Sequence, residues 1–345
     1  MALRALTLAK QQPVISICIA NYNGAELIDQ CLQSVCDQQV DASIEIIVHD
    51  DASSDNSIEI IQSNFPQAKL LLSENNVGFC LANNKMVAAA SGEYILLLNN
   101  DAWLADDAIA TFLEAVERHG DCIFTLPQHG ASDQKLFDCG MHMDLFANAV
   151  PIVEVVEQPV AMVMGACLWI SRTGWDSCGG LPEWFDSMAE DMYLCNRLRL
   201  QGGEVIALSQ SAYFHHIGHS FGGGKVIAAK LRTTVKRRRL SERNKLYVLF
   251  LFYPPLALLI LLPLAVLTLL LEGLLLALIK RDPGLFTQIY GFALGGFWVN
   301  LAKLRRERAA IQYSRTITTR KFFSVYRWLP YKLQMLLRHG IPEVR

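Results

Sequence analysis

The chain has 345 residues, which is enough for one large domain or two smaller ones. A formal net charge of −2 argues against general nucleic-acid binding. The nine cysteines all lie at or before Cys195 and form no C-x-x-C pair. The sequence therefore predicts neither a metal cage nor a disulfide framework, and it favours a reducing compartment.

The chain begins with alternating apolar and amphipathic segments. Residues 1–12 lack the apolar core of a secretory signal, so we expect the catalytic part to stay in the cytosol. An apolar run over residues 14–20 predicts a first strand, which ends at Asn21 and Asn23. Residues 26–35 then place apolar side chains on one face of a predicted helix.

This alternation of strand and helix continues to residue 101. The further predicted elements are helices through residue 61 and over residues 78–90, and strands at residues 44–48, 69–72 and 94–98. Because the strands are continuously apolar and alternate with helices, the sequence predicts an α/β fold with a mostly parallel central sheet.

Polar side chains follow three of these strands at the point where each strand ends. Asn21 follows the first strand, Asp50 and Asp51 follow the second, and an Asn-Asn-Asp run at residues 99–101 follows the strand at residues 94–98. The carboxyl ends of parallel strands share one edge of a sheet. The sequence therefore predicts that the three clusters form one site.

The Asn-Asn-Asp run supplies candidate metal ligands. Asn99 and Asp101 offer oxygen ligands of the kind that Mg²⁺ and Mn²⁺ prefer, and such an ion could hold a diphosphate. The alternative is a turn or a helix N-cap, for which asparagine and aspartate are common residues.

Beyond residue 101 the pattern is looser. Residues 108–118 predict another helix, and residues 163–170 predict an apolar strand interrupted by small residues. A later helix is expected to begin at or just after Glu190 and Asp191. Two acids at a helix start also suit the helix dipole, so this pair is either functional or structural.

The composition changes sharply near residue 247. Residues 247–271 carry no charge, Glu272 is the only charged residue before Lys280, and a second uncharged stretch covers residues 283–302. About 20 apolar residues are enough to span a bilayer. Basic residues precede the first stretch and follow the second, which favours a cytosolic location for both flanks.

Two membrane-embedded arrangements fit these stretches. One is a helical hairpin across the membrane with residues 280–282 at the far turn. The other is monotopic, in which Pro254, Pro255 and Pro263 break the helix and keep it shallow. A buried core helix of a soluble protein is the remaining alternative. The strongly basic tail over residues 303–345 could serve membrane contact or subunit packing.

The polar motifs between residues 13 and 220 occur in an order that a known family shares. They resemble the family 2 inverting glycosyltransferases with the GT-A fold, in particular the rhamnosyltransferase-like branch. Each motif is weak alone, and the ordered series is specific. The matching stretches are residues 14–17, 21–24, 46–55, 76–79, 83–84, 97–101, 165–167, 179–180, 190–191 and 215–216.

Three positions depart from the family's pattern. Asn99 stands where the metal motif usually begins with aspartate, and residues 181–182 are Leu-Pro where Phe-Asp is usual. Tyr193 occupies a position where many relatives carry another acid. These departures bear on the identity of the acceptor more than on the reaction.

The resemblance implies a nucleotide-sugar donor. Asp50 is then expected to accept a hydrogen bond from the N3–H of uracil or thymine, with Asp51 beside it. Asn84 and the loop at Gly78, where a glycine lets backbone approach a ligand, would close the nucleoside pocket. The residues expected to bind the donor are Asn21, Asn23, Asp50, Asp51, Gly78, Asn84, Asn99 and Asp101.

A divalent cation, Mg²⁺ or Mn²⁺, is part of the same expectation. Asp101 is the expected main ligand, because such an ion often uses one or two carboxylates plus substrate phosphates. Asn99 could bind through its carbonyl oxygen or a water. His216 or His215 could add a ligand, and the alternative is a structural histidine pair.

The resemblance also implies an acid–base step. Asp191 is expected to act as general base on the acceptor hydroxyl, and Glu190 is expected to support Asp191 or to contact the sugar. The reaction would be a single inverting displacement at the anomeric carbon.

The sequence thus predicts three segments and one leading function. The segments are an extension (1–12), a GT-A catalytic domain (13–235) and a helical membrane-associating region (236–345). The expected enzyme works at the cytoplasmic face of the plasma membrane, taking dTDP-L-rhamnose as donor and a lipid-linked or polysaccharide acceptor. The alternatives are a UDP-dependent hexosyl- or galactofuranosyltransferase, or a non-catalytic membrane scaffold. A Rossmann dehydrogenase is excluded because no G-x-G-x-x-G follows the first strand.

Overall fold

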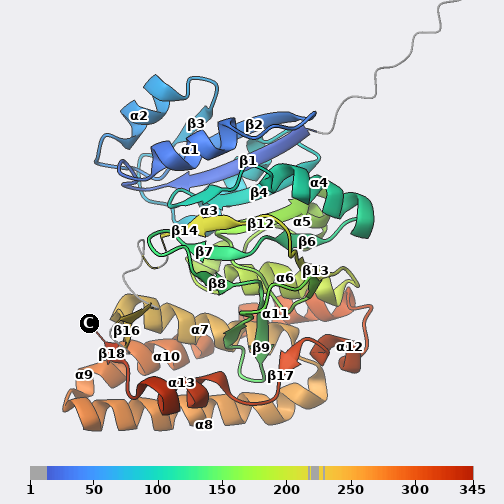
Figure 1. Ribbon diagram of the computed structural model, residues 1–345. Helices are drawn as coiled ribbons and strands as arrows, with labels where there is room; N and C mark the ends of the chain where they lie inside the picture. The colour runs from blue at the N-terminus through green and yellow to red at the C-terminus, as the bar shows by residue number, and fades with distance from the viewer. Residues whose placement is uncertain (1–13, 217, 219–224, 228–229, 345) are drawn as a thin grey trace, which may run out of the picture.

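An eight-stranded sheet forms the centre of the catalytic region (Figure 1). The computed structural model describes residues 14–216, 218, 225–227 and 230–344, so the predicted extension at residues 1–12 lies outside the described residues. The strand order is β11-β13-β6-β12-β4-β1-β2-β3. The part of the sheet that carries the predicted site, β4-β1-β2-β3, is parallel throughout, as the sequence predicts.

The elements of the catalytic region follow the predicted alternation closely. Continuous apolar runs place the strands inside, with β1, β2 and β4 between helical layers. The bounds are β1 Val14–Asn21, α1 Ile28–Cys36, β2 Ser43–Asp50, α2 Ser57–Asn64, β3 Lys69–Leu72, α3 Phe79–Ala89, β4 Tyr94–Asn99, β5 Ala102–Leu104, α4 Ala108–His119, β6 Ile123–Thr125, β7 Gln128–Gly130, β8 Leu136–Asp138, β9 Met141–Asp144, β10 Ala149–Pro151, β11 Gln158–Pro159, β12 Cys167–Ser171, α5 Arg172–Cys178, η1 Glu183–Phe185, α6 Glu190–Leu200, β13 Val205–Ala207 and β14 Tyr213–His215.

The predicted strand at residues 163–170 is shorter than expected. Strand β12 begins only at Cys167, because Gly165 and Ala166 form a turn. The Ala166 carbonyl accepts a hydrogen bond from the backbone N–H of Asn99 (3.0 Å), which fixes this turn against the end of β4. The small residues in the pattern therefore mark a turn at the sheet edge and not an interrupted strand.

The C-terminal region packs directly under the catalytic region (Figure 1). One hydrophobic cluster contains buried residues of both regions, among them Leu194 of α6, Leu249 of α7 and Leu276 of α8. The elements are β15 Lys225–Ile227, β16 Lys230–Thr233, α7 Val235–Phe252, α8 Pro255–Lys280, α9 Pro283–Leu285, η2 Phe286–Gly291, α10 Phe292–Val299, α11 Leu301–Tyr313, α12 Thr319–Phe323, β17 Tyr326–Arg327, α13 Tyr331–His339 and β18 Glu343–Val344.

The prolines of the first apolar stretch have unequal effects. Pro254 and Pro255 separate α7 from α8, as predicted. Pro263 lies inside α8 without ending it, so the prediction that it breaks the helix is wrong. In the part of the chain that the structure describes, α8 is the one helix long and apolar enough to cross a membrane.

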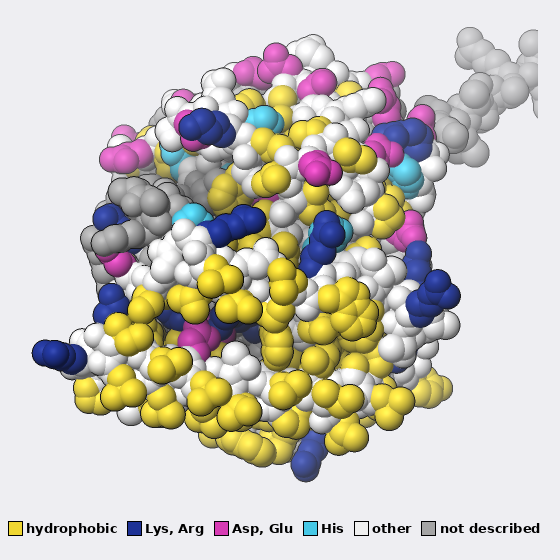
Figure 2. All heavy atoms as spheres, turned by 60° about the horizontal axis from the view of Figure 1, so that its bottom comes forward, with side chains coloured by type: hydrophobic (Ala, Val, Ile, Leu, Met, Phe, Trp, Pro, Cys, Tyr) yellow, Lys and Arg dark blue, Asp and Glu magenta, His cyan; other side chains and the backbone are white. Residues whose placement is uncertain are grey.

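Helix α8 presents its leucines on the side away from the catalytic region. Leu256, Leu259 and Leu278 are each at least 74% exposed, and Trp298 at the end of α10 and Trp328 before α13 are also exposed. Figure 2 shows hydrophobic side chains gathered on this side of the molecule, around a hollow in which charged side chains are visible. We call this surface, formed by outward side chains of α8 and α13, the apolar face.

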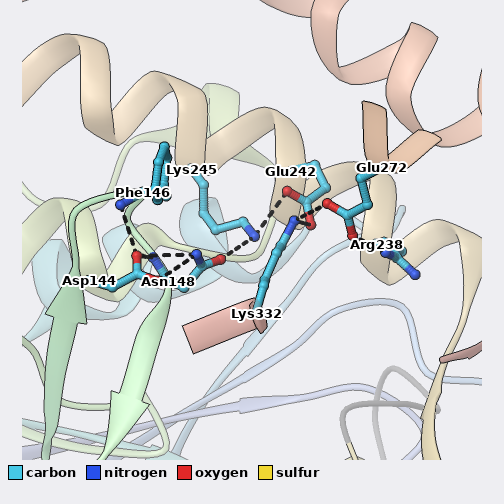
Figure 3. A network of polar contacts seen from close by, with 8 residues as sticks. All are labelled: Asp144, Phe146, Asn148, Arg238, Glu242, Lys245, Glu272 and Lys332. Carbon is cyan, nitrogen blue, oxygen red and sulfur yellow. Dashed lines mark hydrogen bonds and ion pairs between the residues drawn. The ribbon is translucent and has the colours of Figure 1, made fainter. Parts of the chain in front are cut away.

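An ion network joins the inner sides of α7, α8 and α13 (Figure 3). Lys332 of α13 contacts Glu242 of α7 (2.7 Å) and Glu272 of α8 (2.8 Å). Glu272 also pairs with Arg238, and Glu242 pairs with Lys245 (3.0 Å). The positive neighbours hold the pKa of the Glu242 carboxyl below its usual range despite its burial. The only acid of the apolar stretch thus faces its partners and not the leucine side of α8.

The network predicts a specific loss of stability. Glu272→Gln should lower the free energy of unfolding by about 2 kcal/mol, because hydrogen bonds to charged groups contribute about 1.5–3 kcal/mol and two cations lose their shared partner. Chemical denaturation in detergent would measure it. Glu204→Gln breaks an exposed pair with Lys321 (2.9 Å) and should change stability by less than about 1 kcal/mol. Equal losses in the two variants would contradict this role of Glu272.

Candidate active site

Asn21 connects the ends of three neighbouring strands. Its side-chain N–H group donates to Asp50 Oδ2 (2.8 Å) at the end of β2, and its Oδ1 accepts from Asn100 Nδ2 (2.9 Å) after β4. Gly24 allows this approach, because a Cβ there would lie 2.3 Å from both Asn21 Oδ1 and Asn100 Nδ2. The three polar clusters that the sequence places at one sheet edge are therefore in contact.

The two aspartates after β2 shape the neighbouring loops. Asp50 accepts hydrogen bonds from the backbone N–H of Ser53 (2.9 Å) and from its hydroxyl (2.6 Å). Asp51 accepts from the backbone N–H groups of Val77 (2.6 Å) and Gly78 (2.9 Å). A carboxylate has about four lone-pair positions, so these bonds leave acceptor capacity on each side chain. The predicted hydrogen bond from a base to Asp50 stays a prediction.

The other residues expected around the nucleoside lie at two locations: Asn23 and Gly78 near the loops after β2, and Asn84 at a different cavity. Asn23, with φ +49°, accepts from the Ser54 backbone N–H (2.8 Å) and lies beside the Asp50 loop. Gly78, with φ +84°, precedes α3 and donates to Asp51. Asn84 instead exchanges two 2.9 Å hydrogen bonds with the backbone of Leu181 and lines a separate cavity of about 530 Å³.

Asp101 pairs with a histidine that strand β14 delivers. His215 Nε2 lies 3.0 Å from Asp101 Oδ1 and 3.5 Å from Asn99 Nδ2, and all three residues are at most partly exposed. His216, the histidine placed first in the predicted ligand set, lies differently: its backbone N–H donates to the Asp101 carbonyl, and its ring packs at 5.6 Å from the Trp103 ring. The structure therefore brings His215, the alternative histidine, to the Asp101 carboxylate.

A hydrogen-bonded chain behind His215 was not visible in the sequence. Gln128 Nε2 lies 3.2 Å from His215 Nδ1, and the Tyr213 hydroxyl donates to Gln128 Oε1 (2.6 Å). The amide of Gln128 carries both a donor and an acceptor. If this amide is rotated, its oxygen can accept a hydrogen bond from the Nδ1–H of His215, which leaves Nε2 of His215 as an acceptor. This arrangement suits an imidazole that binds a metal through Nε2, with its second nitrogen oriented by a neighbour.

The donor set fits a divalent cation that a substrate diphosphate completes. Asp101 and His215 already converge, and the Asn99 side-chain amide lies nearby, where rotation of the amide would present its oxygen. Among the described residues no group of three or more His, Cys, Asp or Glu side chains could hold a metal, so an all-protein cage is not built. Two or three protein ligands plus phosphate oxygens are the usual set for Mg²⁺, and Mn²⁺ also accepts an imidazole.

Glu190 and Asp191 stand at the first turn of α6. Burial raises the pKa of both carboxyls, and the Asp191 charge raises that of Glu190 further. Glu190 Oε2 is buried without a hydrogen-bond partner among the described residues, whereas the Asp191 carboxylate accepts from the backbone N–H of Met192 (2.7 Å), and the nearby backbone of Gly165 also lowers its pKa. The two environments favour a proton on Glu190 and a charge on Asp191, which is the state that a general base requires.

The turn at Gly165 and Ala166 links the two groups of acids. The backbone of Gly165 is near enough to Asp191 to lower the pKa of its carboxyl, and the next residue accepts from the backbone of Asn99 at the end of β4. The candidate base and the candidate metal ligands are thus attached to adjacent residues of one turn.

The loop before Glu190 has an unusual backbone. The backbone φ angles of Asp186, Met188 and Ala189 are +64°, +74° and +64°. Residues other than glycine rarely adopt such positive values. Such residues cost about 1–3 kcal/mol each and persist where the surroundings determine them. The start of α6 is therefore held in place from outside.

Helix α7 supplies the groups that hold this loop. Asn244 is fully buried, and its side-chain NH₂ lies 2.9, 2.9 and 2.7 Å from the carbonyl oxygens of Phe185, Ser187 and Met188. Arg243 donates to the Phe185 carbonyl (2.8 Å) and to the Asp186 carboxylate (2.9 Å). A buried asparagine in a basic helix gives no signal in a single sequence, because its partners lie 56 to 59 residues away.

Tyr193 stands where many members of the resembling family carry an acid. Its side chain packs where α6 meets α7. Its ring lies 5.6 Å from that of Phe185 and 5.2 Å from that of Phe252. The departure therefore exchanges a polar group for an aromatic link between α6 and α7.

Comparison with known proteins agrees with this architecture. Residues 16–169 match the model of the family described as glycosyl transferase family 2. The chain is 31% identical over 188 residues to a chondroitin synthase of Pasteurella multocida, covering 53% of this chain and 18% of that protein. It is 26% identical over 191 residues to a chondroitin synthase of Escherichia coli, covering 54% and 26%. The chain therefore spans about a quarter or less of the length of these curated relatives.

Two solved structures show the same fold over different shares of the chain. Staphylococcus aureus TarS 1–349 has a TM-score of 0.54 at 15% identity and covers 87% of this chain and 90% of that one. GalNAc-T7 with UDP, GalNAc and Mn²⁺ has a TM-score of 0.53 at 15% identity and covers 59% and 43%. At these identities the likeness concerns the fold, which is GT-A-like.

The contacts of Asn244 predict a variant with a local defect. Asn244→Leu keeps the volume and removes the donors, so the Ser187 and Met188 carbonyls of the strained loop lose their partner, the Phe185 carbonyl keeps only its other donors, and kcat should fall by about tenfold or more. Donor binding at the sheet edge should persist, because Asn244 bonds the loop before Glu190 and not that edge, and calorimetry on the purified chain would measure it. Asn64→Leu, which removes an exposed side-chain bond to Asp29, is the control. Unchanged kcat in a folded Asn244→Leu protein would contradict this positioning role.

Proposed function

Because the chain carries a glycosyl transferase family 2 domain on a GT-A-like fold, we propose that it transfers a sugar from a nucleotide-diphosphate donor to a growing cell-surface glycan. One observation carries the proposal. The edge of the sheet joins Asn21, Asp50 and Asn100, and the turn at Gly165 connects the adjoining Asn99 to the base candidate Asp191. A donor site and a base are therefore adjacent.

The proposed reaction is a single displacement with inversion. Asp191 takes the proton of the acceptor hydroxyl while its oxygen forms a bond to the anomeric carbon, and the nucleoside diphosphate leaves with the bonding electron pair. Glu190, kept protonated by burial and by the Asp191 charge, supports Asp191 without competing for the proton. No covalent bond to the chain is needed.

Asp101, His215 and Asn99 are the residues proposed to hold a divalent cation with the diphosphate. When bound, Mg²⁺ or Mn²⁺ would neutralise charge on the leaving group. The chain's own contribution is to fix the two converging ligands, with Gln128 and Tyr213 orienting the imidazole. The preference between the two ions is left to titration.

The donor sugar has two candidates. dTDP-L-rhamnose follows from the branch that the motifs resemble. A UDP-linked sugar is the second candidate, because relatives of this chain are named chondroitin synthase, hyaluronan synthase and poly(ribitol-phosphate) β-N-acetylglucosaminyltransferase, and rhamnose occurs in none of these names. The names favour a hexosamine or a hexuronate.

The proposed place of work is the cytoplasmic face of the plasma membrane. The apolar face supports this, since exposed leucines gathered on one side suit an interfacial position. Basic side chains on α11 and α13 would add attraction to anionic lipids.

A donor panel tests the enzyme against the scaffold alternative. The purified chain with Mn²⁺ should release nucleoside diphosphate from one of dTDP-L-rhamnose, UDP-galactofuranose, UDP-glucuronate and UDP-N-acetylglucosamine, and coupled nucleotide detection would measure it. Asp191→Asn should bind that donor normally yet lose transfer by at least about 100-fold, the usual contribution of a positioned base. Because burial raises the Asp191 pKa, wild-type activity should fall on the acid side at a pH above the ordinary range of an aspartate.

Asp176→Asn is the matched control, since this exposed carboxylate lies on α5. Normal turnover by Asp191→Asn would remove Asp191 from the mechanism. Absence of donor binding across the panel would favour the scaffold.

The metal proposal predicts different outcomes for the two histidines. Asp101→Ala and His215→Ala should each weaken Mn²⁺-dependent donor binding by about tenfold or more, since even outer partners of a metal site contribute 10- to 100-fold. His216→Ala should weaken it much less, because its ring packs on Trp103. Calorimetric titration of donor with and without Mn²⁺ would measure this. The opposite order of the histidines would contradict the geometry.

A further inference from the structure

A large cavity lies between the catalytic region and the C-terminal helices. It has a volume of about 1680 Å³ and is lined at one end by His215, His216 and Gly130. At the other end it is lined by Leu276 of α8 and Leu333 of α13. The cavity therefore extends from the histidine beside Asp101 to the helices that form the apolar face.

The charged side chains that line the cavity are mostly basic. Over the whole cavity, six Lys and Arg side chains stand against three Asp and Glu side chains. Glu242 and Glu272 are already paired with Lys245, Lys332 and Arg238 in the ion network. The cavity thus keeps a positive excess after its internal pairs are counted.

Arg237 differs from the cavity cations of the ion network, Arg238, Lys245 and Lys332. The structure shows no hydrogen bond or ion pair from its guanidinium to a described residue, whereas its backbone N–H is bonded to Thr234. Glu190 and Asp191 are near enough to raise its pKa, although burial has the larger and opposite effect. A partly buried arginine whose guanidinium has no hydrogen-bond partner among the described residues, close to the candidate base, is suited to a phosphate group.

The apolar end is a track along two helices. Residues 265 to 279 of α8 contribute cavity-lining side chains over roughly 21 Å at the rise of an α-helix. Leu271, Leu275 and Ile279 line the cavity and are also exposed on the apolar face. A hydrocarbon chain could thus enter the cavity from the membrane side along these leucines, beside the ion network that joins α8 and α13.

We propose that this cavity is the acceptor site and that it takes a phosphate-bearing lipid, with the phosphate on Arg237 and the hydrocarbon chain along α8 and α13. The inference rests on the proposed function, since it names the acceptor of that reaction. Continuity with the apolar face and the positive excess both select an anionic head on a long apolar tail. The acceptor hydroxyl then extends from the phosphate toward Asp191.

Direct binding tests the head group. Farnesyl phosphate should bind the purified full-length chain in detergent, and farnesol and inorganic phosphate should each bind at least about tenfold more weakly, because each lacks one half of the recognised chemistry. Arg237→Gln should lose about tenfold in affinity, the worth of a charge-assisted hydrogen bond. Lys236→Gln, an exposed neighbour outside the cavity lining, is the control for the same loss of charge.

Equal binding of farnesol and farnesyl phosphate would overturn the proposal, as would equal losses in the two variants. Competition by phosphatidylglycerol vesicles as strong as that by unlabelled farnesyl phosphate would also overturn it, because the site would then hold ordinary lipid headgroups.

Two neighbouring leucines test the tail. Leu275 lines the cavity and Leu274 does not, and both are exposed on α8 (57% and 51%). Leu275→Trp should raise the KM for a lipid-phosphate acceptor by about tenfold with little change in kcat, while Leu274→Trp keeps wild-type values. Neither substitution touches the core or removes apolar surface.

The lipid-phosphate acceptor site and the proposed sugar transfer would be contradicted by different results. If the chain transfers sugar to a lipid-free glycan as well as to the lipid-phosphate acceptor, or if both tryptophan variants behave alike, the cavity is not the acceptor site while the enzyme remains. If no donor is bound or turned over but farnesyl phosphate binds through Arg237, the proposed function fails and the lipid site stands as a binding site.

Discussion

The hydrogen bonds of Asn244 hold the part of the molecule on which the chemistry depends. The acids of α6 follow a loop with three non-glycine residues at positive φ, a conformation that local sequence does not favour. Asn244 and Arg243 satisfy the carbonyls of that loop from α7. Since α7 also carries Arg238 and Glu242, the candidate base and the apolar helices are connected through one helix.

The sheet and its polar edge could be predicted from the sequence because both rest on local patterns. Continuous apolar runs fix buried strands, and the parallel arrangement brings their carboxyl ends together. Asn21, Asp50 and Asn100 accordingly meet through side-chain hydrogen bonds. Strands β1, β2 and β4 end one or two residues later than predicted, since their last residues, Asn21, Asp50 and Asn99, belong to both the strand and the site.

The rest of the site depends on contacts between distant segments, which a single sequence does not encode visibly. His215 and His216 are adjacent and chemically equal in the sequence, and only the register of β14 against β5 turns His215 toward Asp101. Gln128 reaches His215 through a parallel pairing over 87 residues. Asn84 resembled a nucleoside contact but bonds Leu181, because the loop after α5 folds back onto α3.

The position of Glu272 explains how one helix can serve both a membrane and a cavity. A charge in an apolar helix must find partners when it leaves water, and Arg238 and Lys332 supply them only on one side of α8. This pairing sets the rotation of α8, so that Leu256 and Leu278 point outward while Leu269 and Leu276 point inward. Leu271 and Leu275, between these two directions, then form the margin where the apolar face meets the cavity. The single acid in an uncharged stretch is therefore the residue that makes α8 two-sided.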